Sequence, residues 1–238
     1  MIESFKILAV IPARGGSKSV PLKNLRKING VSIVELAAQL ASEVDYIDRI
    51  IVSTDHHGIA EAAKKGGASV PFMRPEKLSG DSISDLEVLT HAILQMENID
   101  NCTYDIVVML QPTSPLRTKK NIIDSLEMLI KDKYDSVWSV SKTDTKYHPL
   151  KQFHINNNHL NYYDEDGKKI VARQQLNQLY HRNGVVYAIT RDCLLNQKST
   201  KGTNTGALII EGNHVSIDIE WDFDLIEFIQ SKTHEKKN

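Results

Sequence analysis

Short apolar runs alternate with amphipathic segments along most of this 238-residue chain. The first apolar run is Phe5 to Ile11, and comparable runs follow at Arg49 to Thr54 and at Ile106 to Leu110. Between them lie stretches with helical spacing, such as Ser32 to Asp45, which opens with Ser32 and Glu35 in the spacing of a capping box. Strands that alternate with helices are typical of a mostly parallel sheet with helices on both faces. We therefore expect an α/β fold of this kind.

The same pattern predicts the remaining elements. Further strands are expected at Val70 to Met73, at Ser136 to Ser141, at Asn183 to Thr190 and in a run that ends in Ser216 to Ile219. Further helices are expected at His56 to Lys65, Ser84 to Met96, Lys119 to Lys131, Arg191 to Asn196 and Trp221 to Ile229. Lys198 to Gly206 is rich in Gly, Thr and Lys and is expected to be a mobile loop.

The alternation breaks between Lys142 and Gln178, where the chain is polar. Asn156-Asn157-Asn158 and Asp166-Gly167 are turn-forming runs, so this segment is expected to be a hairpin-type insertion and not another strand–helix unit. No stretch has the composition of an interdomain linker. We expect one domain over residues 1–238 with one insertion at about 142–178.

The first strand runs into a cationic loop, Ala13 to Asn24, which carries Arg14, Lys18 and Lys23 beside Gly15-Gly16. No Asp or Glu occurs between Ser4 and Val34, although the whole chain has a formal net charge of -1. Glycines let a backbone approach a phosphate, and fixed cations neutralise it, whereas a merely solvated loop would also carry Lys and Arg. The strand-to-loop placement favours a polyphosphate site. The P-loop and G-x-G-x-x-G patterns are absent, which disfavours a P-loop kinase or GTPase and a standard dehydrogenase.

Composition excludes several other classes of protein. With 41% hydrophobic and 25% charged residues the chain has the composition of an ordinary globular protein. Its near-zero net charge gives no support for binding to nucleic acid or to an anionic membrane. No apolar run approaches the ~20 residues of a membrane span, and Pro12 interrupts the first one, which makes a poor signal peptide. Cys102 and Cys193 lack metal-binding spacing and are expected to be reduced thiols. We expect a cytoplasmic protein with no nucleic acid and no membrane as partner.

Ligands of doubly wound sheets bind outside the carboxyl ends of the strands. Beside the cationic loop, the positions that map there are Asp55, Gln111 and the pair Asp218 and Glu220. On a strand, residues two apart share a face, and two neighbouring carboxylates suit a hard cation such as Mg²⁺. Plain alternation of polar and apolar residues on a half-exposed strand gives the same pattern, so both interpretations stay open. Gln111 stands in a turn that Pro112 makes rigid, which suits recognition of a polyhydroxylated sugar, although such a turn is by default only a connection.

Five segments occur in an order that is characteristic of one family. They are Ala13 to Asn24, L-Q-P-T-S-P-L-R at Leu110 to Arg117, R-Q-Q-L at Arg173 to Leu176, N-G-V-V-Y at Asn183 to Tyr187 and S-I-D-I-E at Ser216 to Glu220. Through these segments the chain resembles the bacterial CMP-sialic acid synthetases, which are N-acylneuraminate cytidylyltransferases. The segments are spread along the chain, so the resemblance covers essentially its whole length. The resemblance implies the Rossmann-like nucleotide-diphospho-sugar transferase fold and a homodimer built through the insertion. It also implies a Mg²⁺-dependent enzyme that joins CTP to a nine-carbon keto-acid sugar, giving the CMP-sugar and pyrophosphate.

The resemblance also assigns roles to residues of this chain. Arg14, Lys18 and Asp218 would be catalytic, and the nucleotide would contact Arg14, Ser17, Lys18, Lys23, Asn24 and Arg74. The sugar would contact Gln111, Lys151, Arg173 and Tyr187, with Lys151 or Arg173 acting on the partner subunit's site. Without the resemblance, Lys151 and Arg173 would be interpreted as surface cations, whereas for Tyr187 a core aromatic and a sugar contact would stay equally open. Asp218 and Glu220 would hold the metal, but the family typically has Asp at the second position, which puts the role of Glu220 in doubt.

The identity of the sugar stays open. Sialic acid, legionaminic acid and related nonulosonic acids differ only in substituents, whereas CMP-Kdo synthetases usually carry a different loop and a different mid-chain motif. The alternative from another class is a non-catalytic nucleotide-binding protein, which only the Glu at position 220 favours.

Overall fold

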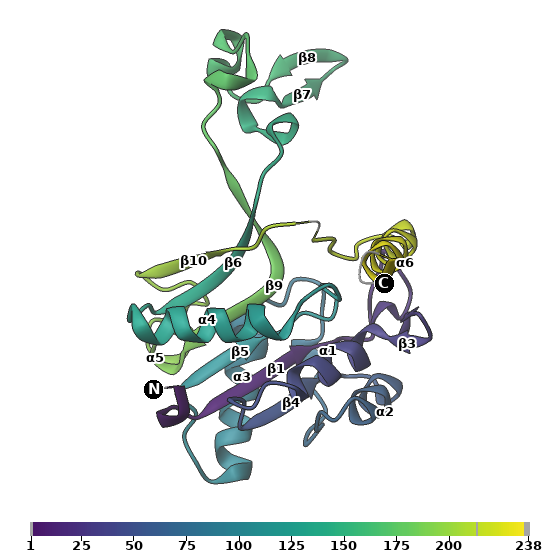
Figure 1. Ribbon diagram of the computed structural model, residues 1–238, viewed down its shortest axis with the longest axis vertical. Helices are drawn as coiled ribbons and strands as arrows, with labels where there is room; N and C mark the ends of the chain where they lie inside the picture. The colour runs from purple at the N-terminus through teal and green to yellow at the C-terminus, as the bar shows by residue number, and fades with distance from the viewer. Residues whose placement is uncertain (1, 213, 236–238) are drawn as a thin grey trace.

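A six-stranded sheet forms the centre of the computed structural model, which describes residues 2–212 and 214–235 (Figure 1). The strand order is β10-β6-β9-β5-β1-β4. The strands are β1 (Ile7–Pro12), β4 (Arg49–Ser53), β5 (Ile106–Met109), β6 (Ser136–Lys142), β9 (Tyr180–Thr190) and β10 (Thr205–Ile209). Only β9 runs antiparallel to its neighbours in this sheet, so the expected mostly parallel α/β architecture is confirmed.

Helices cover both faces of the sheet. They are α1 (Ile33–Ser42), α2 (His57–Lys65), α3 (Asp85–Asp100), α4 (Lys119–Lys131), α5 (Arg191–Leu195) and α6 (Glu220–Glu235). Because side chains alternate along a strand, Ile7, Ala9 and Ile11 of β1 pack with α1, α2 and α4, while Leu8 and Val10 pack with α3 and α5. A sheet buried on both faces explains why its strands read as continuous apolar runs.

A third, smaller core lies beneath α6. Phe223 and Ile226 of α6 pack against Val20, Ile28 and Ile217. Ile28 belongs to the small ribbon of β2 (Lys27–Ile28) and β3 (Val31–Ser32), which follows the cationic loop. This core therefore holds the segment before α6 next to the loop after β1. No helix of the described residues is long and apolar enough to cross a membrane.

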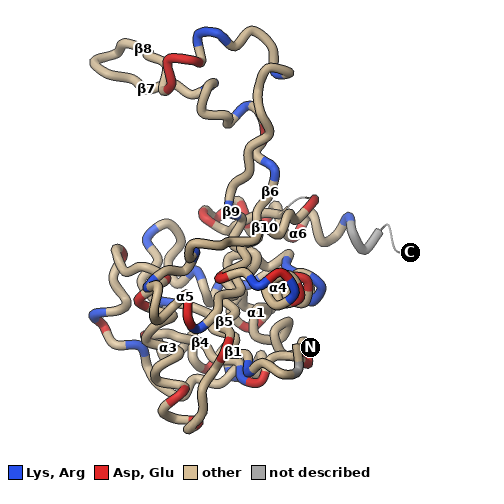
Figure 2. Tube along the Cα trace, turned by 90° about the vertical axis from the view of Figure 1, so that its left-hand side faces the viewer, with Lys and Arg blue, Asp and Glu red and all other residues tan. Residues whose placement is uncertain are grey.

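Residues 143–179 form an arm that stands away from the sheet in both views (Figure 1, Figure 2). It contains the antiparallel hairpin of β7 (Phe153–Asn156) and β8 (His159–Tyr162). The short 3₁₀ helices of the chain are η1 (Ile2–Ser4), η2 (Lys23–Leu25), η3 (Glu76–Leu78), and in the arm η4 (Thr145–Tyr147), η5 (Pro149–Lys151), η6 (Glu165–Lys169) and η7 (Arg173–Gln175). Large apolar side chains of the arm are exposed: Phe153, Ile155, Leu160, Tyr163 and Val171. None of the arm residues that the structure describes joins a core cluster.

Two expected strands are wrong, and one expected loop is right except at its end. Ser216–Ile219 is not a strand, because Ile217 donates its N–H to Thr113 O at 2.9 Å and not to a ladder. Val70–Met73 is irregular, and only Ser69 makes an isolated bridge, with Ile51. The last two residues of the expected loop at Lys198 to Gly206 belong to β10. This strand lies at the edge of the sheet and most of its residues are at least partly exposed, so its start is hard to recognise in the sequence.

The capping prediction at α1 is half right. Ser32 is the N-cap residue, but its side chain makes no capping hydrogen bond. Complete capping boxes occur instead at Ser84 with Glu87 before α3 and at Thr118 with Asn121 before α4.

Candidate active site

Two adjoining cavities lie where β1, β5 and β10 lead into their connections. The loop cavity has a volume of about 390 Å³ and is lined by residues that include Arg14, Ser17, Lys23, Asn24 and Arg74. The β9 cavity, of about 490 Å³, is lined by residues that include Trp138, His181, Arg182, Asn183 and Tyr187. Four residues line both cavities: Asp85, Gln111, Ser216 and Asp218. The two cavities therefore form one continuous site with two halves.

Hydrogen bonds fix the shape of the cationic loop. Asn24 Nδ2 donates to Arg14 O at 2.9 Å, and Gly15 N donates to a carboxylate oxygen of Asp55 at 2.8 Å. Lys23 Nζ donates to Ile217 O at 2.8 Å, which ties the loop to the segment before α6. Arg14, Ser17, Lys23 and Asn24 are thus brought together as the sequence predicted.

Two cations of this loop form ion pairs with a carboxylate of the same chain, that of Asp81. Arg14 Nη1 lies 2.8 Å from a carboxylate oxygen of Asp81, and Lys18 Nζ pairs with the other oxygen. The hydrogen bonds from Lys18 and Arg14 lower the pKa of Asp81, which keeps it charged. Lys18 is 81% exposed and is not among the described residues that line either cavity, so it reaches the site only through Asp81.

Arg74 is a buried member of the loop cavity. Its Nη2 donates to Ser53 O at 2.7 Å and its Nη1 to Leu78 O at 3.4 Å. Burial lowers the pKa of its guanidinium. These contacts anchor Arg74 at the end of β4, next to the cationic loop.

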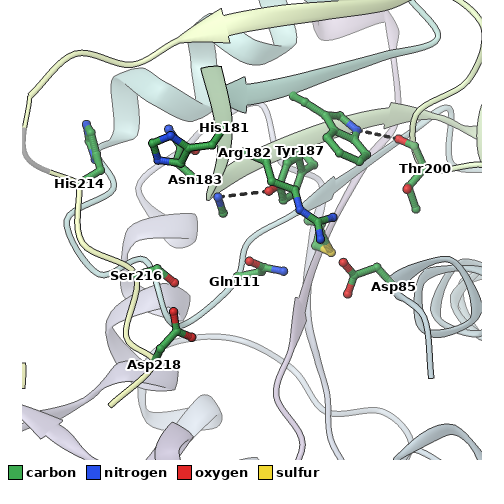
Figure 3. A pocket seen from close by; sticks show the side chains of 13 residues that line it. Asp85, Gln111, His181, Arg182, Asn183, Tyr187, Thr200, His214, Ser216 and Asp218 are labelled. Carbon is green, nitrogen blue, oxygen red and sulfur yellow. Dashed lines mark hydrogen bonds between the residues drawn. The ribbon is translucent and has the colours of Figure 1, made fainter. Parts of the chain in front are cut away.

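The β9 cavity presents an amide, a phenol and a guanidinium (Figure 3). Tyr187 is buried, stacks edge-on against Trp138 with ring centroids 5.0 Å apart, and its hydroxyl accepts from Gly184 N at 3.1 Å. Gly184 has φ +71°, and a Cβ there would lie 2.6 Å from Gln111 Oε1. Only glycine therefore leaves room for the Gln111 amide where it stands.

A buried cation supports this half of the site from behind. Arg117 Nη2 donates to Gln111 O at 2.7 Å and to Gly184 O at 3.4 Å, and its Nε donates to Val185 O. Burial lowers the pKa of Arg117 to about 9, which still leaves it protonated at neutral pH. The last residue of the L-Q-P-T-S-P-L-R run thus joins the end of β5 to β9.

The two carboxylates of the S-I-D-I-E segment do not share a strand face. Asp218 lines both cavities, is 80% exposed, and lies 3.8 Å from Lys23 Nζ. Glu220 is the first residue of α6 and pairs with Arg26. The described residues contain no group of three or more His, Cys, Asp or Glu that could hold a metal alone. A single exposed carboxylate nevertheless fits Mg²⁺, which is commonly held by one or two carboxylates together with substrate phosphates.

Lys151 and Arg173 lie on the arm and line neither cavity of their own chain. The structure therefore does not bring them together with Gln111 and Tyr187.

Several residues of the site escaped the sequence analysis, among them Asp81, Trp138, Arg182 and Asp85. Asp85 follows the N-cap of a helix, where an acidic residue is explained by the helix dipole alone. Arg182 directly precedes the N-G-V-V-Y run, which is the one signal that could have drawn attention to it.

Comparisons with known proteins identify the family. The family model described as "Cytidylyltransferase" matches residues 8–228. This chain belongs to the cytidylyltransferase family. It is 32% identical over 219 residues to the CMP-N,N'-diacetyllegionaminic acid synthase of Legionella pneumophila, covering 92% of this chain and 93% of that protein. It is 29% identical over 231 residues to the pseudaminic acid cytidylyltransferase of Campylobacter jejuni, covering 97% and 98%. The resemblance to synthetases of the CMP-sialic acid type is confirmed, and the chain is a nucleotidyltransferase.

A solved structure confirms the fold. The chain is similar to CMP:2-keto-3-deoxy-manno-octonic acid synthetase, solved in complex with CTP, with a TM-score of 0.71. The similarity covers 96% of this chain and 99% of that one at 18% sequence identity.

Proposed function

We propose that this cytidylyltransferase transfers CMP from CTP to a nine-carbon 2-keto acid sugar, a nonulosonic acid, and releases pyrophosphate. The observation that carries the proposal is the continuous two-part site, with cations in one half and hydrogen-bonding groups of β5 and β9 in the other. The similarity to enzymes named for legionaminic and pseudaminic acid supports the same substrate class.

In this proposal the loop cavity binds the nucleotide. Arg14, Lys18 and Lys23 neutralise the triphosphate, whose charge would displace the Asp81 carboxylate from Arg14 and Lys18. Asn24, Ser17 and Arg74 complete this half, with Arg74 toward the nucleoside. Displacement at phosphorus depends mainly on positioning and on neutralising charge, which such a loop supplies.

The β9 cavity binds the sugar, so that its C2 hydroxyl meets the α-phosphorus at the residues common to both cavities. Gln111 and Tyr187 contact the sugar, and Arg117 holds the backbone that carries Gln111. Mg²⁺ beside Asp218 would supply positive charge to the phosphates.

We further propose a cytoplasmic homodimer formed through the arm. The exposed apolar side chains of the arm need a partner surface, and Lys151 and Arg173 lie too far along the arm to serve their own site. In the homodimer, Lys151 and Arg173 of one subunit would face the sugar bound in the site of the other subunit.

Pyrophosphate release tests the function. Purified protein is incubated with CTP, Mg²⁺ and each of N-acetylneuraminic, legionaminic and pseudaminic acid, with the eight-carbon acid Kdo as the comparison sugar. We expect release with at least one nine-carbon acid and little with Kdo, and less release when ATP or GTP replaces CTP. CTP binding without turnover on any sugar would favour a non-catalytic nucleotide-binding protein and contradict the proposal.

A further inference from the structure

The residues that line both cavities mark the place of reaction. Asp85, Gln111, Ser216 and Asp218 are the four, and of these only Asp85 and Asp218 carry a carboxylate, the kind of group that can act as a general base. Cytidylyl transfer forms a bond between a ligand of one cavity and a ligand of the other, so groups on their boundary lie within reach of the reacting atoms. Asp218 lies beside Lys23 and is the proposed metal ligand, which leaves Asp85.

Asp85 gains from the helix dipole at the start of α3, but no partner among the described residues ties its carboxylate to the fold. It is the first residue of α3, but Ser84 and Glu87 make the capping box of that helix. Among the described residues, no hydrogen bond or ion pair joins the Asp85 side chain to another group. Figure 3 shows its carboxylate pointing toward the cavity, where the Arg182 guanidinium faces it.

Arg182 is the matching feature on the opposite wall. It lies in β9 near a register irregularity with β6, between Trp138 and Val140, and projects into the β9 cavity. No ion pair within the described chain engages its guanidinium. The cavity therefore contains one uncommitted carboxylate and one uncommitted cation that face each other.

The chemistry of a 2-keto acid sugar fits this pair. In its ring form, C2 carries both a carboxylate and the hydroxyl that attacks phosphorus. We propose that Asp85 accepts the proton of this hydroxyl while Arg182 binds the carboxylate on the same carbon, an inference that rests on the proposed sugar substrate. The C2 oxygen then forms its bond to the α-phosphorus, the bond from the α-phosphorus to the bridging oxygen breaks with departure of pyrophosphate, and Asp85 passes its proton to water. A planar guanidinium suits a carboxylate because it can donate two parallel hydrogen bonds.

Other groups in or near the site that could accept a proton already have partners. Asp81 binds Arg14 and Lys18, and Asp55 accepts from Gly15 N. His214 lines the β9 cavity, but its Nε2 lies 3.1 Å from Glu211 O and its Nδ1 is buried. His181 lines only the β9 cavity and its Nδ1 lies 3.1 Å from Thr143 Oγ1. Asp85 is consequently the carboxylate without a partner on the boundary of the two cavities, among the residues that the structure describes.

The charged environment of Asp85 sets its pH dependence. Arg182 and Tyr187 of β9 and Arg74 before η3 are the titratable groups that face it. Burial raises the pKa of Asp85, and Arg182 and Arg74 oppose that rise. A base must be ionised to act, so kcat/KM rises with pH through the pKa of Asp85, and the burial effect moves this rise toward neutral pH.

Two substitutions test the pair in the full-length protein. Asp85→Asn should lower kcat by about 10²- to 10⁴-fold, the usual contribution of a general base, and should abolish the rise of kcat/KM on the acid side. Asp85→Glu should retain that rise. Arg182→Met should raise the KM for the sugar by tenfold or more and leave the KM for CTP unchanged, with Arg182→Lys in between. Asp124→Asn, on the outer surface of α4 where it pairs with Lys120, is the matched control and should behave as the parent.

Each result bears on one idea. An inactive parent on all sugars contradicts the proposed function, whereas an active parent with an Asp85→Asn variant within threefold of it contradicts this inference. An unchanged acid-side profile in Asp85→Asn, or an unchanged sugar KM in Arg182→Met, would overturn the corresponding role. CTP should raise the melting temperature of every variant by mass action, which shows that each is folded. If Asp85→Asn does not fold, the kcat of Asp85→Glu decides, because moving the base by one methylene must lower kcat when Asp85 takes the proton, and an unchanged kcat would contradict the inference.

Discussion

Gly184→Ala offers a direct test of how Gln111 is positioned. Gly184 has φ +71°, and a Cβ there would lie 2.6 Å from Gln111 Oε1 and 3.1 Å from Ser114 Oγ. An ordinary contact begins near 3.4 Å, so the Gln111 amide must move by about 0.8 Å (3.4 − 2.6). The obstructing atom is the end of a flexible side chain, so the amide moves and the fold persists.

The turn of β2 and β3 supplies a matched control. Gly30 has φ +86°, and a Cβ there would meet nothing within 4 Å. Both substitutions place an L-residue in the left-handed region, which costs about 1–2 kcal/mol. For a domain of this size each kcal/mol lowers Tm by about 2–4 °C, so both variants should lose about 2–8 °C.

Activity should separate the two variants. A displacement of about 1 Å in a positioning group can cost about 10²-fold in rate, so Gly184→Ala should lose between tenfold and 10²-fold in kcat/KM for the sugar. Gly30→Ala should retain the parent's activity, and CTP should stabilise both equally. Steady-state kinetics with the preferred sugar and thermal shift with CTP measure this. Equal kcat/KM in the two variants would refute the placement of Gln111 against the sugar.

Three further predictions concern the nucleotide half. Lys18→Ala should lower kcat by about 10²-fold, the scale of losing one stabiliser of transition-state charge, and a change below threefold would make Lys18 a solvated surface cation. Asp81→Asn should lower the KM for CTP severalfold at all pH values from 6 to 9, because the competing carboxylate is lost and its pKa is already depressed; a raised KM would show that Asp81 assists binding. Asp218→Asn should nearly abolish activity, whereas Glu220→Gln should leave the Mg²⁺ concentration for half-maximal rate unchanged, as titration of Mg²⁺ would show.

The sequence predicts the central sheet well because its strands are buried on both faces. A run such as Ile106 to Met109 is completely buried, so its apolar character needs no context to be recognised. β10 was missed because it lies at the edge of the sheet, where Leu208 and Thr205 are only partly buried and the preceding stretch is rich in turn residues.

The residues of the site also fall into a group that the sequence predicts and a group that it does not. The cationic loop is local in sequence, so Arg14, Lys23 and Asn24 could be recognised together. Asp85 and Arg182 face each other only because β9 inserts antiparallel between β5 and β6, and no local pattern predicts that a helix start and that strand lie on opposite walls of one cavity.

The position of Glu220 removes the strand on which both interpretations of S-I-D-I-E depended. The shared strand face does not exist, because Asp222 accepts from the backbone N–H groups of Asp218 and Ile219 at 2.6 and 2.9 Å and turns the chain into α6. Glu220 then stands at a helix N-terminus, where a carboxylate is favourable, and pairs with Arg26, whose guanidinium lies 5.3 Å from the centre of the Phe223 ring. We infer that Glu220 fastens α6 to the turn after the cationic loop, which leaves Asp218 as the proposed metal ligand of this segment. Since both side chains of the Glu220–Arg26 pair are about half exposed, breaking it should cost about 1 kcal/mol or less. Glu220→Gln should thus shift Tm by a few degrees at most, and a severalfold rise in the Mg²⁺ requirement would return Glu220 to the metal.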